Sequence, residues 1–351
     1  MNRVPAFELR PGYIISRVIR GGWQLAGGHG RVDRAEAIAD YMAFAKAGIF
    51  TFDCADIYTG VEELIGAFRK ELARTHGAEA AAKLRVQTKL VPDLEALASV
   101  NRAYVTGIVD TSLKRLGMER LDLVQFHWWD YAVPRYLDAL HWLDELRRAG
   151  KVNLIGGTNF DTARTLEIIG AGIPLASMQV QYSLIDARPH RALAKAALEH
   201  DFRILCYGSV AGGFLSDRWL GVAEPKAPLE NRSLTKYKLI IDDFGGWALF
   251  QSLLRCLRAI AGRRGTDIAT MASAAMLEKP GVAAVIVGAR NRAHLAQNVR
   301  IGTLQLTVQD NQEIAAVVAQ GKVPEGDVYT LERDRAGRHG QIIKYNLNKA
   351  S

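Results

Sequence analysis

Eight short apolar runs, separated by longer amphipathic stretches, are the feature that most constrains how this chain can fold. The runs are rich in β-branched residues, and most are apolar at consecutive positions, as expected of strands buried on both faces of a parallel sheet. Regular alternation of such strands with helices predicts an α/β fold. Because there are eight of them, we expect a closed (β/α)8 TIM barrel, whose active site lies at the C-terminal ends of the strands. The expected strands are 18–22, 50–53, 84–90, 121–126, 152–156, 178–182, 203–207 and 283–287.

Two long segments exceed what a minimal barrel needs. A mixed-polarity insertion at 216–246 follows the seventh strand, and a basic tail at 323–351 follows a helix at 308–318. Loops of this length are commonly lids or binding loops. We therefore predict one domain over residues 1–351, with a barrel core at about 16–300 and a C-terminal helix and tail at 301–351. The other helices are expected at 34–47, 61–73, 99–116, 135–149, 163–169, 189–199, 248–261, 267–277 and 292–298.

Composition and charge narrow the functional classes. Hydrophobic residues make up 49% of the 351 residues and charged residues 23%, which is ordinary for a globular protein. The net charge of +8 is scattered and accompanies no nucleic-acid-binding motif, so we expect no nucleic-acid partner. Neither a membrane span nor a signal peptide is evident. The three cysteines form no Cys-x-x-Cys pair and no metal-ligand cluster stands out, so we expect reduced thiols, no metal and a cytoplasmic location.

Polar side chains stand at the ends of three successive expected strands. Asp53 ends the second strand, Lys89 lies at the end of the third, and His127 follows the fourth. Neighbouring strands are about 4.7–4.9 Å apart, so long side chains at these positions can meet. Tyr58, in the loop after Asp53, can fold back over the same rim. Each residue alone is more often structural than catalytic, but their matching positions favour a shared site.

These four residue types suit carbonyl reduction. When a hydride reaches the carbonyl carbon, the oxygen gains negative charge and needs a proton, which a tyrosine can supply. A nearby lysine cation is expected to lower the tyrosine pKa from its reference value of about 10, and an aspartate holds the lysine in place. A neutral histidine can donate a hydrogen bond to the developing oxyanion. The cofactor supplies the hydride, and the protein supplies the acid and the electrostatics.

Several longer motifs resemble those of the aldo-keto reductases, over about residues 16–298. The resemblance implies that Asp53, Tyr58, Lys89 and His127 form the catalytic tetrad of that family, with Tyr58 as the general acid. The motifs are Ser112-Leu-Lys-Arg-Leu-Gly-Met-Glu-Arg-Leu-Asp-Leu, Leu146-Arg-Arg-Ala-Gly-Lys-Val, Gly156-Gly-Thr-Asn-Phe, Gln179-Val-Gln-Tyr-Ser and Ile286-Val-Gly-Ala-Arg.

The same resemblance implies a nicotinamide cofactor. Thr158 and Asn159, with Gln179 beside them, match residues that bind the nicotinamide carboxamide, and Tyr207 matches the aromatic residue that stacks on the ring. No Gly-x-Gly-x-x-Gly follows a strand, so a Rossmann-type site is not supported. The remaining cofactor candidates are Gly22, Trp23, Gly208, Ser209, Gly288, Ala289, Arg290, His294, Gln297 and Asn298.

Two positions at the expected adenosine end depart from the family pattern. Many relatives have Ser where Ala289 stands, and Arg or Gln where His294 stands, and both positions usually help to hold the ribose 2′-phosphate. Arg290 can take over this function, because a guanidinium binds phosphate in a bidentate manner. We therefore favour NADP(H) over NAD(H).

Aromatic residues near the strand ends are the candidate substrate contacts. Trp23 follows the first strand, and Trp128 and Trp129 follow His127. Aromatic walls suit both apolar carbonyls and the faces of sugars, so we expect a small aldehyde, ketone or sugar as substrate. Two alternatives stay open: a non-catalytic, nicotinamide-nucleotide-sensing regulatory subunit on the same fold, and an unrelated barrel enzyme that binds no nicotinamide. The sequence also leaves the oligomeric state and the reaction direction open.

Overall fold

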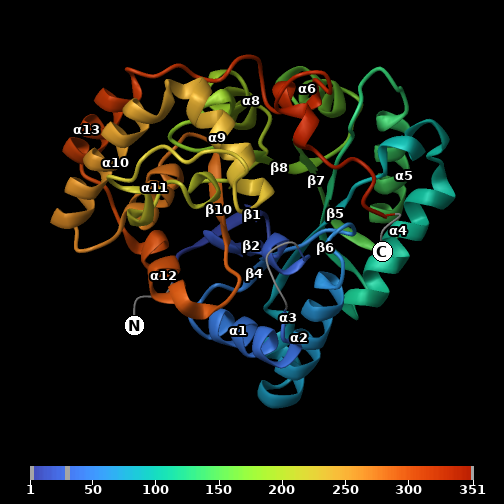
Figure 1. Ribbon diagram of the computed structural model, residues 1–351. Coiled ribbons are helices and arrows are strands. Elements are labelled where there is room, and N and C mark those ends of the chain that lie inside the picture. The colour runs from blue at the N-terminus through green and yellow to red at the C-terminus, as the bar shows by residue number, and fades with distance from the viewer. Residues whose placement is uncertain (1–3, 28–31, 349–351) are drawn as a thin grey trace.

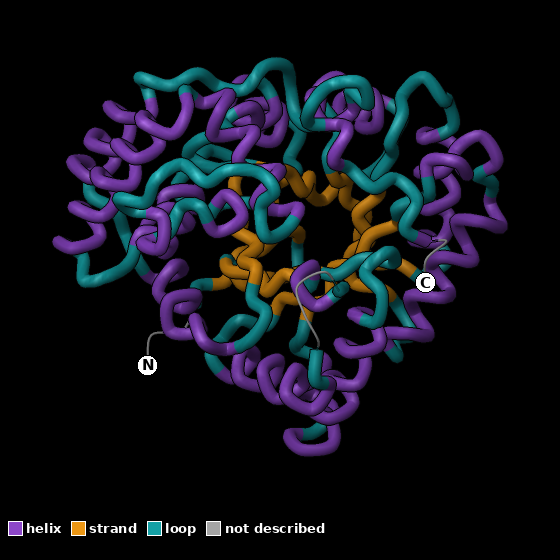
Figure 2. Tube along the Cα trace, viewed as in Figure 1, coloured by secondary structure: helices purple, strands orange, loops and turns teal. Residues whose placement is uncertain are grey.

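A computed structural model describes residues 4–27 and 32–348, so the ends of the expected domain, 1–3 and 349–351, lie outside the described residues. Its centre is a closed barrel of eight parallel strands, seen as the orange ring in Figure 2. This confirms the expected TIM barrel, and each expected strand has its counterpart. The strands are β3 (Val18–Gly21), β4 (Thr51–Asp53), β5 (Arg85–Leu90), β6 (Leu121–Phe126), β7 (Val152–Thr158), β8 (Leu175–Gln181), β9 (Arg203–Tyr207) and β10 (Val282–Gly288).

Helices surround the barrel (Figure 1). Six of the described α-helices begin at a polar side chain that caps the backbone; for example, Asp33 accepts a hydrogen bond from the Glu36 amide, and Asn101 accepts one from the Tyr104 amide. Their apolar faces pack on the strands, which are buried on both sides. The longer helices are α1 (Arg34–Lys46), α2 (Val61–His76), α4 (Arg102–Leu116), α5 (Tyr136–Arg148), α6 (Thr162–Gly170), α8 (Leu193–Glu199), α9 (Arg232–Phe244), α10 (Gly246–Arg263), α11 (Ile268–Leu277), α12 (Leu295–Thr303) and α13 (Val308–Val318), and the short ones are α3 (Ala78–Ala82), α7 (Arg188–Arg191) and α14 (Thr330–Arg333).

An antiparallel hairpin precedes the barrel and was not expected from the sequence. It consists of β1 (Ala6–Arg10) and β2 (Tyr13–Ser16). Its buried side chains Leu9 and Ile15 join a cluster with Ala176 and Ala283, the second residues of β8 and β10. The hairpin therefore covers the N-terminal end of the barrel, leaving the C-terminal end for a ligand.

The expected insertion after the seventh strand contains a helix that the sequence analysis missed. Helix α9 buries its apolar residues at helical spacing, and its N-cap Asn231 accepts a hydrogen bond from the Leu234 amide. The two prolines and the mixed polarity of the insertion are typical of a loop and obscure this helical spacing. The buried residues of α9 are Leu234, Tyr237, Ile240, Ile241 and Phe244.

The C-terminal tail crosses the C-terminal end of the barrel (Figure 1). At one point the Arg232 side chain donates a hydrogen bond to the Ile342 carbonyl (2.8 Å). Further on, the Leu94 amide donates to the Tyr345 carbonyl (3.0 Å), and the Asn348 side chain donates to the Val91 carbonyl (2.9 Å). The tail thus connects α9 with the loop after β5. In the described part of the chain, no helix is both long and apolar enough to cross a membrane.

Candidate active site

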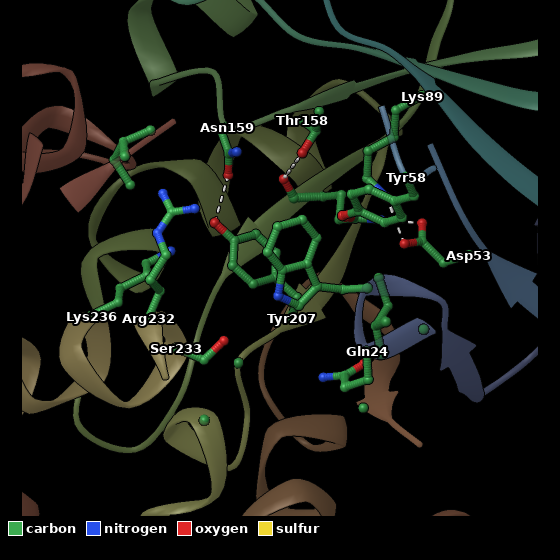
Figure 3. Close-up of a pocket in the computed structure, with 18 of the residues that line it drawn as sticks. Gln24, Asp53, Tyr58, Lys89, Thr158, Asn159, Tyr207, Arg232, Ser233 and Lys236 are labelled. Carbon is green, nitrogen blue, oxygen red and sulfur yellow. Dashed lines mark hydrogen bonds and ion pairs between the residues drawn. The ribbon is translucent and has the colours of Figure 1, made fainter. Parts of the chain in front are cut away.

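Asp53, Tyr58 and Lys89 meet at the C-terminal end of β4 and β5, as the sequence predicts (Figure 3). The Lys89 ammonium lies 2.6 Å from Asp53 Oδ2 and 2.8 Å from the Cys54 carbonyl oxygen. It also lies 5.0 Å from the centroid of the Tyr58 ring. Both side chains of the ion pair are almost completely buried, with 6% and 5% exposure. The pair is therefore an internal feature of the pocket rather than a surface salt bridge.

Two glutamines hold the Asp53 carboxylate in place. Its other oxygen, Oδ1, accepts hydrogen bonds from Gln179 Nε2 (2.6 Å) and Gln125 Nε2 (3.1 Å). The Gln179 amide nitrogen also lies 3.2 Å from Gln125 Oε1. Because a buried carboxylate is tolerated only when its hydrogen-bonding capacity is filled, these contacts explain how Asp53 is accommodated inside the pocket. Gln125 was not identified from the sequence, although it is the register partner of Lys89 and lies one residue before the end of β6.

Burial decides the ionisation of Tyr58 in this structure. It raises the pKa of Tyr58 above its ordinary value, and the nearby Lys89 cation lowers the pKa without cancelling that rise. Lys89 thus acts in the expected direction, but the effect of burial on the Tyr58 pKa is larger. Burial would lower the pKa of Lys89 in turn, but Asp53 and Tyr58 outweigh it and raise the value. Tyr58 is a neutral phenol beside a firmly protonated lysine.

His127 is held in one tautomer by a backbone carbonyl. Its Nδ1 lies 3.0 Å from the Thr158 carbonyl oxygen, which can only accept a hydrogen bond, so Nδ1 carries the proton. Burial, aided by Arg333, lowers the pKa of His127 to about 3, so the ring is neutral at physiological pH. Its Nε2 is buried, has no partner among the described residues and is an acceptor in this tautomer. The expectation that neutral His127 donates to an oxyanion is therefore wrong for this geometry.

The ends of β7 and β9 form the next part of the pocket wall. The Tyr207 hydroxyl donates to Asn159 Oδ1 (2.8 Å), which fixes the ring beside the cavity. The Thr158 hydroxyl donates to the Gln179 carbonyl (3.1 Å), and the Asn159 amide donates to the same oxygen (3.0 Å). The Gln179 side chain donates a hydrogen bond to Asp53 through Nε2, so its Oε1 is the atom that can accept a hydrogen bond from a ligand. Gly208 follows with φ +74°, and any Cβ there would lie 2.2 Å from the Tyr237 hydroxyl.

A cavity of about 500 Å³ connects these residues. This volume is in the usual range of small-molecule sites. Trp23 packs edge-on against Tyr58 with ring centroids 5.2 Å apart, and Trp129 does so against His127 at 4.2 Å. The residues expected from the sequence that line the cavity are Trp23, Asp53, Tyr58, Lys89, His127, Trp129, Thr158, Asn159, Gln179, Tyr207, Gly208, Ser209 and Gly288.

Other expected site residues lie outside this cavity. Trp128 was expected to contact the substrate, but it does not line the cavity. It is completely buried, its Nε1 donates a hydrogen bond to the Val133 carbonyl (3.0 Å), and its ring packs on Phe126. Gly22 is packed against the Asp53 carbonyl, where a Cβ would come within 2.9 Å. The other five are expected cofactor contacts in the segment 289–298, which follows Gly288 at the end of β10. Of these, Ala289 and Asn298 are buried, Gln297 is half-buried, and Arg290 and His294 are exposed.

The sequence analysis missed the lining residues that come from the insertion and the tail. From α9 and its cap these are polar or aromatic, and from the tail they are aromatic, aliphatic and basic. The signal available for the first group was the helical spacing after Asn231. The missed residues of the insertion and the tail are Asn231, Arg232, Ser233, Lys236, Tyr237, Tyr329, Ile342, Ile343, Lys344 and Leu347, and Gln24, which follows β3, was missed as well.

Fold and site together define a class of protein. They are those of a (β/α)8-barrel enzyme, with its ionisable groups at the C-terminal rim, where barrels of this kind carry their active sites. A model of the Aldo/keto reductase family matches residues 17–319, and the chain belongs to this family.

Individual relatives agree with this assignment. The chain is 26% identical over 306 residues to the aldo-keto reductase YhdN of Bacillus subtilis (strain 168), which covers 86% of this chain and 90% of that protein. It is 23% identical over 324 residues to the NADH-specific methylglyoxal reductase of Escherichia coli (strain K12), covering 84% and 92%. The structure of the glycerol dehydrogenase AKR11B4 from Gluconobacter oxydans has the same fold, with a TM-score of 0.74, 22% identity and coverage of 93% and 97%.

Proposed function

We propose that this protein is an NADP(H)-dependent oxidoreductase that interconverts a small carbonyl compound and its alcohol, with Tyr58 as the general acid in reduction. One observation supports this more than any other. A half-buried, neutral Tyr58 lies beside the buried Lys89–Asp53 pair, in the same cavity as His127. A proton donor next to a fixed cation is the arrangement that a developing alkoxide requires.

The cavity fits a nicotinamide nucleotide. The Tyr207 ring offers an aromatic surface, and Asn159 and Gln179 bring amide groups to the same part of the wall. Glycines at 208, 212 and 213 line the cavity beside α9, where an extended phosphate-bearing ligand can approach the backbone. We assign the nicotinamide end to the residues around Tyr207 and the adenosine end to those after β10.

The reaction balances with one hydride and one proton. When bound, the nicotinamide supplies a hydride to the carbonyl carbon. Tyr58 gives its phenolic proton to the carbonyl oxygen, and the Lys89 ammonium stabilises the phenolate that remains. Asp53 keeps Lys89 in position. His127 Nε2 then accepts a hydrogen bond from the new hydroxyl group, and in oxidation the phenolate takes the proton back.

The preference for NADP(H) rests on the segment after β10. Arg290 and His294 are exposed there, beside the cavity-lining Gly288, where they can reach a ribose phosphate. A planar guanidinium suits this group. Relatives of the chain include one named as NADH-specific and one named for NADP(+), so the preference differs between members of the family.

The test combines binding with turnover. We expect saturable quenching of tryptophan fluorescence by NADPH, more weakly by NADH, because Trp23 and Trp129 line the cavity. We also expect NADPH-dependent reduction of simple aldehydes by the purified protein alone, and a loss of roughly a hundredfold or more in kcat for Tyr58→Phe, with NADPH affinity unchanged. Binding without turnover would instead favour the regulatory-subunit alternative, and wild-type rates in Tyr58→Phe would show that another group is the acid.

A further inference from the structure

The cavity wall contains more basic than acidic side chains. Among the described lining residues the basic ones are Lys89, Arg232, Lys236 and Lys344, and the acidic one is Asp53. Asp53 is already paired with Lys89. The other three cations therefore face the cavity without a carboxylate in its wall.

These three cations differ in position. Arg232 lies at the start of α9, near the loop that contains glycines 208, 212 and 213, and its guanidinium donates a hydrogen bond to the Ile342 carbonyl. A Cβ on Gly212 would come within 3.3 Å of the Ser233 carbonyl, so this end of the helix adjoins the loop assigned to the cofactor. Lys344 is exposed on the tail at the mouth. Lys236 is one helical turn beyond Arg232 and half-buried (Figure 3).

The Lys236 ammonium lies among aromatic rings rather than carboxylates. Its Nζ is 5.2 Å from the centroid of the Tyr207 ring and 5.8 Å from that of Tyr329. No described residue gives it a hydrogen bond or an ion pair within normal distances. The Tyr329 ring in turn packs edge-on against His127, with centroids 5.7 Å apart. Lys236 and His127 thus both lie next to the Tyr329 ring, on the wall of the same cavity.

A buried ion cluster of Arg188, Asp186 and Glu332 explains why the Lys236 ammonium is tolerated at this position. The cluster does not accept hydrogen bonds from Lys236. Arg188 binds Asp186 and, through Nη1 and Nη2, both oxygens of Glu332 at 2.9 Å. Two carboxylates and one guanidinium leave this cluster with one net negative charge. Burial lowers the pKa of Lys236, while Glu332 raises it in part, so the cluster favours the ammonium form. The Glu332 oxygens are already taken by Arg188, and the N–H groups of Lys236 remain available to a ligand.

We propose that the substrate carries an anionic group, a carboxylate or a phosphate, which Lys236 binds while the carbonyl lies at Tyr58 and His127. This inference rests on the proposed function and specifies its substrate class. An anion supplies the hydrogen bonds that the ammonium lacks and offsets the unbalanced charge of the wall. A neutral substrate would leave a half-buried cation without a partner, which costs free energy.

The experiment compares matched anionic and neutral carbonyls. The pairs are 4-oxobutanoate with butanal, and glyceraldehyde 3-phosphate with glyceraldehyde, which also separate carboxylate from phosphate. We expect the wild type to prefer at least one anionic member. Lys236→Met keeps the length of the side chain, and we expect it to lower kcat/KM for that member by roughly ten- to a hundredfold, with little change for its neutral partner and in NADPH affinity. Lys236→Arg should restore most of the preference.

The control is Lys238→Met on the same helix. Lys238 is paired with Glu224 and Asp242, both at 2.6 Å, and does not line the cavity, so the preference should be unchanged. The proposal is overturned if the wild type favours neither anion, or if Lys236→Met weakens NADPH binding and affects both members of a pair equally, since Lys236 would then hold a cofactor phosphate.

A binding measurement separates failure of this inference from failure of the proposed function. The protein loaded with NADP(+) is titrated calorimetrically with 4-hydroxybutanoate and with inorganic phosphate. Binding of either by the wild type that is lost in Lys236→Met supports the anion site even if no carbonyl is turned over. Equal binding by both proteins, or no binding of either probe, contradicts it even if neutral aldehydes are reduced.

Discussion

Glu332→Gln tests whether the buried ion cluster holds the C-terminal tail against the barrel. Arg188 joins Asp186, just after β8, to Glu332 in the tail, and the three side chains are 2% exposed or less. Burial alone would raise the pKa of Glu332, but Arg188 outweighs it and lowers the value from 4.5 to about 2. This lowering corresponds to about 3 kcal/mol of folding stability at neutral pH. Removing one partner of a buried ion pair typically costs about 3–5 kcal/mol, which agrees.

The sign of the pH dependence follows from the lowered pKa. The folded protein holds the Glu332 proton less tightly than the unfolded chain, so the stability that Glu332 contributes is present above about pH 4.5 and is lost as the pH falls toward 2. Near pH 3.5 roughly 2 kcal/mol of the original contribution remains. We therefore expect Glu332→Gln to be less stable than the wild type by about 3 kcal/mol at pH 7, and by a smaller amount at pH 3.5.

Urea denaturation at both pH values, followed by tryptophan fluorescence, measures this difference. The matched control is Glu325→Gln, an exposed residue of the same tail, which should change the free energy of unfolding by no more than about 0.5 kcal/mol. A loss below 1 kcal/mol at pH 7, or an equal loss at both pH values, would refute the argument, because the stabilisation would then not come from the charge of Glu332.

Two further predictions concern side chains near His127. Trp128→Phe should lower the thermal unfolding temperature and leave KM for the carbonyl substrate unchanged, because Trp128 is buried away from the cavity. Trp129→Phe should change this KM, because Trp129 lines the cavity. Equal effects on KM in the two variants would contradict these positions. Between about pH 5 and 8 we expect no titration of His127, because burial lowers its pKa to about 3; nitrogen-15 NMR should find the proton on Nδ1, and a proton on Nε2 would contradict the hydrogen bond to Thr158.

The barrel and its rim were predictable because their signals are local. A strand such as β10 is apolar from Val282 to Val287, and a charged residue near the C-terminal end of a strand, such as Lys89 in β5, lies at the rim. Trp128 and Trp129 show where this reasoning ends. Side chains alternate only while the strand continues, and both residues come after β6, so the sequence does not say which one faces the cavity.

The rest of the cavity wall depends on contacts between distant parts of the chain. Glu332 forms an ion pair with Arg188, which lies 144 positions earlier in the chain, and the sequence near either residue does not indicate this pair. The expected substrate selectivity depends on the same kind of contact: Lys236 comes from the insertion, Tyr329 from the tail, and the ion cluster joins the tail to the loop after β8. Asp53, Tyr58, Lys89 and His127, the residues proposed to support hydride transfer, lie on the barrel rim instead. Because the two sets occupy separate segments, changes in the insertion or the tail can alter the substrate while the tetrad keeps its geometry.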